Sequence, residues 1–313
     1  MLIDLHRHLE GSIRPGTALE FAGRDGHWLA AADDPRPELI ATGAGGGLLP
    51  YLAKIETAAS TARRADDWYR IAAEAVADAA ADGLGHLELR FSPRFVAAVT
   101  GLPAAAVIDA VTDGVAAAGR DLALTIGLIA IVVRDLGPVS AAEQMDLILA
   151  RQDGFVAVDL AGDEAGYPPA LFAPSFRRAR EAGLGVTIHA GEAAGPPSVA
   201  AALDHLHPDR IGHGVRSAED PRLMDRLARE DITLEVALTS NVHTGAAASL
   251  ARHQIRTLTA AGVPVTLNTD NPTVSQTTLT RELDGVARAA GLTPDDCRAA
   301  AAQAARAAFN PIP

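Results

Sequence analysis

Eight short apolar runs recur along the chain, and a stretch with helical periodicity follows most of them. The spacers 65–82, 141–151 and 219–229 carry apolar residues at helical spacing and acidic residues near their starts. Strands that alternate with helices favour a parallel sheet, and eight of them predict a closed (β/α)₈ TIM-type barrel in the α/β class. The eight predicted strands are 1–6, 86–92, 123–133, 155–162, 185–192, 210–214, 232–241 and 263–271.

The length of the chain suits one barrel domain spanning residues 1–313. With 48% hydrophobic residues, the sequence can bury a large core. The glycine-rich segment 41–47 could be a linker between two domains, but the residues before it are too few for a core of ordinary size. We therefore interpret 41–47 as a hinge or lid loop.

Charge and composition exclude several classes of protein. A net charge of −12 without a basic patch argues against nucleic-acid partners. Cys297 is the only cysteine, so an internal disulfide and a cysteine-ligated zinc site are both excluded. No apolar run approaches the roughly 20 residues of a membrane helix, and the first residues do not resemble a signal peptide. We expect a cytoplasmic protein without a membrane partner, while the sequence leaves its oligomeric state open.

Histidines and an aspartate stand at the ends of four predicted strands. His6 and His8 are two residues apart and therefore face the same side of the first strand. His189, His213 and Asp270 end the fifth, sixth and eighth runs. Active sites of such barrels form at the carboxyl ends of the strands. Imidazoles and a carboxylate gathered there suit zinc or another borderline divalent metal ion.

Glu192 follows His189 by three residues and is a candidate proton donor, because a carboxyl group shielded from water beside a metal site can stay protonated. The alternative is that Glu192 caps the next helix. His27, His86 and His253 are isolated in the sequence, and we interpret them as surface or packed residues without a role in the site.

Seven motifs together resemble, in order and spacing, the adenosine deaminases of the metal-dependent amidohydrolase superfamily, especially the bacterial ones. This resemblance implies a hydrolase of purine salvage that converts adenosine or 2′-deoxyadenosine to the 6-oxo nucleoside and ammonia. It also implies one zinc ion per chain, held by His6, His8, His189 and Asp270 with an open position for water. The motifs are "LIDLHRHLEGSIRP", "HLELRFSP", "VDLAGDE", "HAGEAAGP", "RIGHGV", "EVALTSN" and "LNTDN".

The resemblance also implies roles around the purine nucleoside. Glu192 would protonate N1 as the nucleophile adds at C6, and His213 would orient the water and take up its proton. Gly162 would donate its backbone N–H to N3, and the Asn271 amide, in place of the usual aspartate, would donate to N7. His8 would border the substrate as well as the metal.

Further residues would shape the edges of the pocket. Leu48, Leu49, Tyr51 and Leu52 match an apolar helix that closes over the base, although ordinary packing explains them equally well. Asp159, Asp163 and Glu164 are expected to support the rim of the barrel.

Glu10 departs from the family pattern, in which an aspartate binds the 5′-hydroxyl of the ribose. The longer side chain shifts the carboxylate by roughly an ångström and leaves the sugar contact open. The alternative substrates are therefore adenine itself or a 5′-modified nucleoside such as 5′-methylthioadenosine. Cytidine-type deaminases are excluded because their zinc signature needs more than one cysteine. A non-catalytic binding relative is disfavoured because the ligand set and both catalytic candidates are present.

Overall fold

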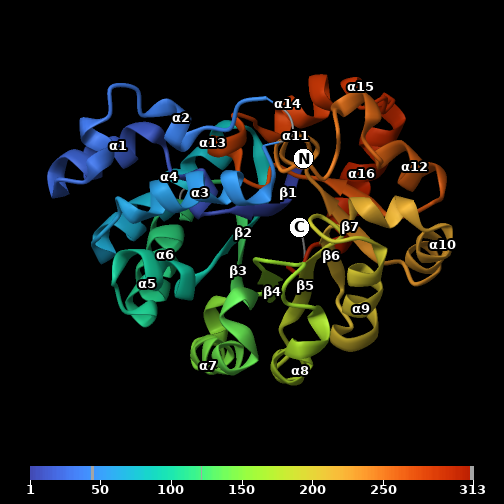
Figure 1. Ribbon diagram of the computed structural model, residues 1–313, viewed down its shortest axis with the longest axis horizontal. Coiled ribbons are helices and arrows are strands. Elements are labelled where there is room, and N and C mark those ends of the chain that lie inside the picture. The colour runs from blue at the N-terminus through green and yellow to red at the C-terminus, as the bar shows by residue number, and fades with distance from the viewer. Residues whose placement is uncertain (44–45, 121, 311–313) are drawn as a thin grey trace.

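Eight parallel strands form the centre of the molecule, with helices around them (Figure 1). This computed structural model describes residues 1–43, 46–120 and 122–310. Each strand pairs in parallel with the next one along the chain, from β1 to β8. The predicted (β/α)₈ barrel is therefore confirmed. The strands are β1 (Leu2–His8), β2 (Leu84–Phe91), β3 (Thr125–Val133), β4 (Ala157–Ala161), β5 (Gly185–Ala190), β6 (Arg210–His213), β7 (Thr233–Val236) and β8 (Val265–Leu267).

The segment after β8 joins the first strand and brings the two ends of the sheet together. Asp270 forms a parallel bridge with Arg7, three residues beyond the end of β8. The N–H of His8 donates to the Asp270 carbonyl at 2.7 Å, and the N–H of Asp270 donates to the His6 carbonyl at 2.7 Å. These backbone bonds fix the relative position of the two segments that carry the candidate metal ligands.

Eight helices follow the strands in a barrel-like succession and cover the sheet (Figure 1). Further helices fill the remaining connections. The covering helices are α4 (Ala65–Ala81), α6 (Ala104–Gly119), α7 (Gly137–Leu149), α8 (Ala173–Glu181), α9 (Pro196–Leu206), α10 (Pro221–Arg229), α12 (Ile255–Ala260) and α16 (Pro294–Ala307). The others are α1 (Pro15–Asp25), α2 (Arg36–Leu39), α3 (Leu48–Ser60), α5 (Pro93–Thr100), α11 (Leu238–His243), α13 (Pro272–Ser275), α14 (Leu279–Arg281) and α15 (Ala287–Ala289).

The helices at 65–82 and 219–229 are confirmed as α4 and α10, whereas the helix predicted at 141–151 begins earlier, at Gly137. The strand predicted at 232–241 is correct only in its first half. It ends at Val236, and residues 238–243 form α11. No glycine or proline stands between Val236 and Leu238 to mark the end of the strand in the sequence, which explains the error.

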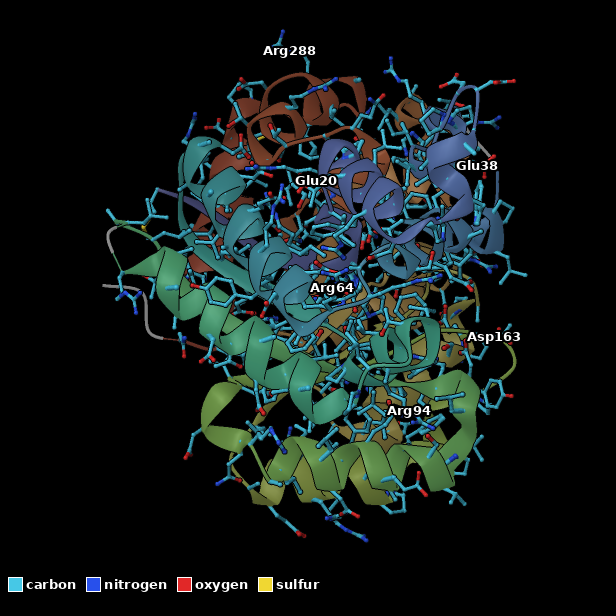
Figure 2. The ribbon with its side chains drawn as sticks, turned by 90° about the vertical axis from the view of Figure 1, so that its left-hand side faces the viewer. Glu20, Glu38, Arg64, Arg94, Asp163 and Arg288 are labelled. Atoms are coloured by element: carbon cyan, nitrogen blue, oxygen red, sulfur yellow. The ribbon has the colours of Figure 1, made fainter. Side chains whose placement is uncertain are left out.

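Surface ion pairs connect the N-terminal helix to α4 on the side shown in Figure 2. Arg70 binds Glu20 with Nη1 2.7 Å from the carboxylate, and Arg64 binds Asp25 at 2.9 Å. Such exposed pairs contribute little individually to stability.

Residues 44–45 of the predicted loop at 41–47 lie outside the described residues. Among the helices that the structure describes, none alone is long and apolar enough to cross a membrane. Helices α5 and α6 reach that length and apolarity only together, and the pair is bent by 116°.

Gly114 lies where α6 crosses α4. A Cβ atom at this position would come within 2.3 Å of the Tyr69 carbonyl oxygen and 3.0 Å of the Ala72 Cβ. Because backbone cannot give way cheaply, we expect Gly114→Ala to lower the free energy of unfolding by about 1–3 kcal/mol. Gly23→Ala in α1 is the control, since nothing lies within 4 Å of its added Cβ. That substitution should stabilise by about 0.5–1 kcal/mol. Denaturant titrations test both, and equal midpoints for the two variants would contradict the close crossing.

Candidate active site

Five side chains converge at the carboxyl ends of β1, β5 and β6 and on the segment after β8. Nε2 of His8 lies 3.3 Å from Nε2 of both His6 and His189, and 3.2 Å from Oδ1 of Asp270. One potential ligand atom each from His6, His189, His213 and Asp270 lies within 4.8 Å of the others. The strand ends thus bring together the predicted ligands, and His213 lies beside them.

Two buried carboxylates orient two of the imidazoles. Nδ1 of His6 lies 2.7 Å from Glu235 on β7, and Nδ1 of His189 lies 2.9 Å from Asp159 on β4. A carboxylate accepts the Nδ1 proton, so the Nε2 lone pair of each ring points at the centre of the cluster. The Nε2 lone pairs of these imidazoles and the Asp270 carboxylate all place negative charge density at one point, which a cation bound between them would stabilise. The donor set therefore fits a divalent metal ion with nitrogen and oxygen ligands.

Arg90 connects those two carboxylates. Its Nη1 donates to Asp159 at 2.9 Å and its Nη2 to Glu235 at 2.8 Å, with the side chain fully buried. Arg210 pairs with Glu235 and with Glu88 one level deeper in the barrel. Buried charges persist only when paired and hydrogen-bonded. The guanidinium group of Arg90 thus positions both carboxylates that orient the histidines.

His213 and Asp270 adopt left-handed backbone conformations, with φ of 60° and 61°. Such angles cost energy for residues other than glycine and are concentrated at functional sites. They turn both side chains into the cluster, His213 at the last residue of β6 and Asp270 three residues beyond β8. Asp270 also accepts a hydrogen bond from Ser240, and His213 Nδ1 lies 3.0 Å from the Asn241 amide nitrogen.

Glu192 lies beside the cluster, with Oε2 3.6 Å from Nε2 of His213. Burial raises the pKa of Glu192 to about 8, and the nearby charge of Asp270 acts in the same direction. Its carboxyl group is therefore protonated at neutral pH. The N-cap of α9 is Gly195, without a side-chain bond, so the alternative that Glu192 caps this helix is wrong.

The loop that carries Glu192 is held by Glu164. The Glu164 carboxylate accepts backbone N–H groups from Gly191, Glu192, Ala193 and Ala194 at 2.5 to 3.1 Å. Four donors on one buried carboxylate fix the loop relative to the segment after β4. The expectation that Glu164 supports the rim agrees with these contacts.

A cavity of about 340 Å³ opens over the cluster. This volume is in the range of small-molecule sites. Burial lowers the pKa of His8 well below its ordinary value, so this imidazole stays neutral at the cavity floor. The lining includes the predicted site residues His8, Glu10, Gly162, His189, Glu192, His213, Asp270 and Asn271, and also Leu48, Leu49, Tyr51 and Leu52 of α3.

Glu10 occupies one end of this cavity on a single helical turn after β1. Its Oε1 accepts the Ser92 N–H at 2.7 Å, whereas Oε2 is buried and has no hydrogen-bond partner among the residues that the structure describes. Burial raises the pKa of Glu10 to about 7. A buried polar atom without a partner is costly, so Oε2 is suited to bind a polar group of a ligand.

Gly162 and Asn271 line the cavity. A side chain larger than glycine would clash at position 162 itself and at Gly11, on which Asn271 packs. Gly162 has φ 115°, and an added Cβ would lie 2.3 Å from Oδ1 of Asp135. The Asn271 Oδ1 packs on Gly11, where a Cβ would come within 1.9 Å. The nitrogen end of the Asn271 amide is therefore the end left to face a ligand.

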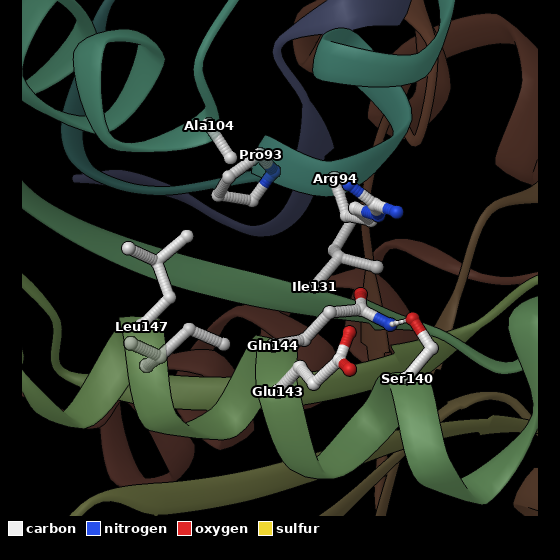
Figure 3. A pocket seen from close by; sticks show the side chains of 9 residues that line it. Pro93, Arg94, Ala104, Ile131, Ser140, Glu143, Gln144 and Leu147 are labelled. Atoms are coloured by element: carbon white, nitrogen blue, oxygen red, sulfur yellow. Dashed lines mark hydrogen bonds between the residues drawn. The ribbon is translucent and has the colours of Figure 1, made fainter.

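A second cavity of about 110 Å³ lies between α5 and α7 (Figure 3). Gln144 lines it and bonds both to the Val133 backbone and to Ser140. It shares only Ile131 with the larger cavity and contains no residue of the histidine cluster. We therefore do not place the active site there.

Sequence reasoning missed four residues around the cluster, namely Arg90, Glu235, Asn241 and His253. Arg90 and Glu235 were visible as charges inside apolar strands, which is a signal of buried pairing. His253 is buried, in agreement with the prediction of a surface or packed residue, but it is not remote from the site: its Nε2 lies 3.3 Å from the Asn241 amide oxygen, behind His213. His27 and His86 are buried away from the cluster, as expected.

Comparisons with known proteins agree with this geometry. The family described as adenosine deaminase matches residues 2–313. An adenosine deaminase of Serratia proteamaculans is 42% identical over 98% of this chain and 93% of its own length, and one of Klebsiella pneumoniae is 42% identical over 96% and 90%. Among solved structures, an adenine deaminase of Arthrobacter aurescens matches with TM-score 0.89 and 27% identity, covering 99% of this chain and 94% of its own. A zinc-bound amidohydrolase of Burkholderia ambifaria matches with TM-score 0.85 and 27% identity, covering 98% and 85%.

Proposed function

The chain belongs to the adenosine deaminase family, and from this premise we propose how its cavity deaminates adenosine and 2′-deoxyadenosine by hydrolysis. The protein is a hydrolase with a purine nucleoside as its small-molecule substrate. The observation that carries the proposal is the position of Glu192, whose pKa is raised by burial, beside a buried cluster of metal-binding donors, with both facing one cavity. We assign it to purine salvage in the cytoplasm, with residues 1–313 as one domain.

His6, His8, His189 and Asp270 would hold a single zinc ion. Three imidazoles and a carboxylate match zinc's preference for nitrogen and oxygen ligands, and the related amidohydrolase of Burkholderia ambifaria contains zinc. When bound, zinc lowers the pKa of a water molecule to about 7 and so makes a nucleophile available at neutral pH. Asp159 and Glu235 would fix the ring orientations of His189 and His6.

Glu192 would act as the general acid. Addition of oxygen at C6 transfers charge to N1 of the purine, and the Glu192 proton neutralises that charge as it forms. The resulting carboxylate can then receive the proton of the attacking water and pass it to the amino group, which leaves as ammonia. Glu164 keeps the acid in place by fixing the loop from Gly191 to Ala194.

The remaining site residues would recognise and orient the reactants. His213, next to Glu192, would orient the attacking water. The resemblance also implies that His213 takes up the proton of the water; we assign that proton instead to the carboxylate that Glu192 becomes after N1 is protonated. The Gly162 N–H would bind N3, and the Asn271 amide would donate to N7, which accepts hydrogen bonds only. The apolar side of α3, with Leu48 and Leu52, would cover the base.

A second candidate substrate is adenine, or a nucleoside modified at the 5′ position. Two observations favour this alternative: Glu10 stands where the family usually has aspartate, and the related structure from Arthrobacter aurescens is an adenine deaminase. The chemistry at C6 is the same for all these substrates. The candidates differ only in what lies against the Glu10 end of the cavity.

We expect adenosine and 2′-deoxyadenosine to give the highest kcat/KM among these substrates. Glu10→Asp should change the value for adenosine by less than about tenfold, because a water can fill the space of one methylene. Ammonia release from adenosine, 2′-deoxyadenosine, adenine and 5′-methylthioadenosine measures this preference, with Glu10→Gln as the control for the carboxyl charge. A higher kcat/KM for adenine than for adenosine, together with a shift of preference toward adenosine in Glu10→Asp, would overturn the substrate assignment. The proposed hydrolytic deamination at C6 would still hold.

A further inference from the structure

His213 is backed by two buried polar residues that do not touch the cavity. Asn241, on α11, is fully buried, and His253, just before α12, is only 6% exposed. The three side chains form one hydrogen-bonded line that starts at the N-terminus of α12 and ends in the active site. In such a line, each hydrogen-bond donor determines which atom of the next side chain must be an acceptor.

The first contact fixes the protonation of His253. The backbone N–H of Ile255 donates to Nδ1 of His253 at 3.0 Å. A backbone N–H can only donate, so Nδ1 must be the acceptor, and the proton of the neutral ring is on Nε2. Nε2–H then donates to Oδ1 of Asn241, 3.3 Å away.

The second contact fixes His213. With its oxygen turned to His253, the Asn241 amide presents Nδ2 to Nδ1 of His213 at 3.0 Å. An amide NH₂ only donates, so Nδ1 of His213 is an acceptor and the neutral ring carries its proton on Nε2. That nitrogen faces Glu192, with 3.6 Å between Nε2 and Oε2.

We propose that His253 is a positioning residue, which acts through Asn241 to hold His213 in the tautomer with an N–H pointing into the active site. His213 then has no lone pair on Nε2, which separates it from the metal ligands and leaves His8 as the third imidazole of the set. The meaning for catalysis rests on the proposed deaminase function, but the tautomer itself does not.

In this tautomer His213 donates a hydrogen bond to the attacking water rather than taking its proton. The water oxygen forms a bond to C6, and Glu192 gives its proton to N1. The O–H bond of the water breaks, and that proton goes to the Glu192 carboxylate just formed. The same carboxyl group then gives this proton to the C6 amino group, the C6–N bond breaks to release ammonia, and the remaining hydroxyl proton returns to the carboxylate. His213 stays neutral throughout.

The test is ¹⁵N NMR of histidine-labelled, zinc-loaded protein, which distinguishes protonated from unprotonated ring nitrogens. In the wild type we expect His213 with Nε2 protonated and Nδ1 unprotonated. His253→Leu should give a mixture of tautomers and lower kcat/KM by about 10- to 100-fold at unchanged zinc content, an effect typical of lost orienting partners. His253→Gln keeps an N–H donor and should recover most of both losses.

His27→Leu is the matched control. His27 is also buried, its Nδ1 accepts the backbone N–H two residues later at 3.2 Å, and its Nε2 contacts Ser60 at 3.1 Å. It lies outside the cavity lining, so this variant should leave the His213 signals and activity unchanged.

Protonated Nδ1 on His213 in the wild type would overturn the proposal, as would a His253→Leu variant with an unaltered tautomer. If His253→Leu does not fold, Asn241→Asp replaces it: an acceptor facing Nδ1 should move the proton there, and an unchanged spectrum would equally refute the relay. Because the NMR readout needs no turnover, failure of the relay and failure of the deaminase assignment are distinguishable.

Discussion

Glu192→Gln is expected to lower kcat/KM for adenosine by about 10²- to 10⁴-fold, the usual contribution of a positioned general acid. The amide keeps the size and burial of the side chain but has no acidic proton for N1. Zinc content and the unfolding midpoint should stay close to those of the wild type. Steady-state ammonia release with metal analysis measures the effect, and Glu219→Gln on the exposed surface is the control. A loss below tenfold would contradict the role of Glu192.

The pH profile provides a second test of the same residue. Burial raises the pKa of Glu192 to about 8, so its acid form predominates below that pH and is lost above it. We therefore expect kcat/KM of the wild type to fall as the pH rises through the ionisation of Glu192. Glu192→Gln should lack this alkaline limb, because its amide does not titrate. An alkaline limb of equal size in both proteins would assign the ionisation to another group.

Removal of the metal ion should lower activity by about 10³-fold or more, because several kcal/mol of transition-state stabilisation depends on it. Zinc should restore activity, whereas magnesium should not, since magnesium prefers oxygen ligands in octahedral geometry. Dialysis against a chelator, followed by stepwise addition of each ion, measures both. Zinc should also raise the unfolding midpoint by binding only to the native state.

His189→Ala is the control for that experiment. It removes one imidazole of the cluster, so the same concentration of zinc should restore little activity. Full activity after exhaustive chelation would show that the cluster is not the catalytic centre. Equal restoration by magnesium would instead contradict the assignment of zinc.

Much of the fold was predictable because buried parallel strands are short apolar runs with helical spacers between them. Six predicted strand ends lie within two residues of the observed ones, and His6, His189 and His213 accordingly stand near the carboxyl ends of β1, β5 and β6. The predicted ends of β7 and β8 are four to five residues too late. The run 232–241 was misassigned because no glycine or proline separates the strand in its first half from the helix in its second half. Asp270 lies beyond β8 and is positioned by bonds to β1, which no local pattern indicates.

His253 shows where sequence reasoning ends. His27 and His253 have the same local pattern: each precedes an apolar residue by two positions and accepts that residue's N–H on Nδ1. Only the position of Asn241 on α11, between His253 and His213, gives His253 a partner that contacts the active site. Side-chain relays between segments distant in sequence therefore become visible only in the folded chain.

The buried arginines under the cluster also determine which charge the site can accept. Arg90 and Arg210 offset two of the three carboxylates Glu88, Asp159 and Glu235, and Asp270 adds a further negative charge beside the imidazoles. With Glu192 protonated, this group of side chains carries an excess of two negative charges, which a divalent ion balances. In an interior of low dielectric constant an unbalanced charge is expensive. The excess negative charge thus favours a divalent ion, and the imidazoles favour a metal that binds nitrogen ligands. Departure of the ion should be coupled to proton uptake by the cluster.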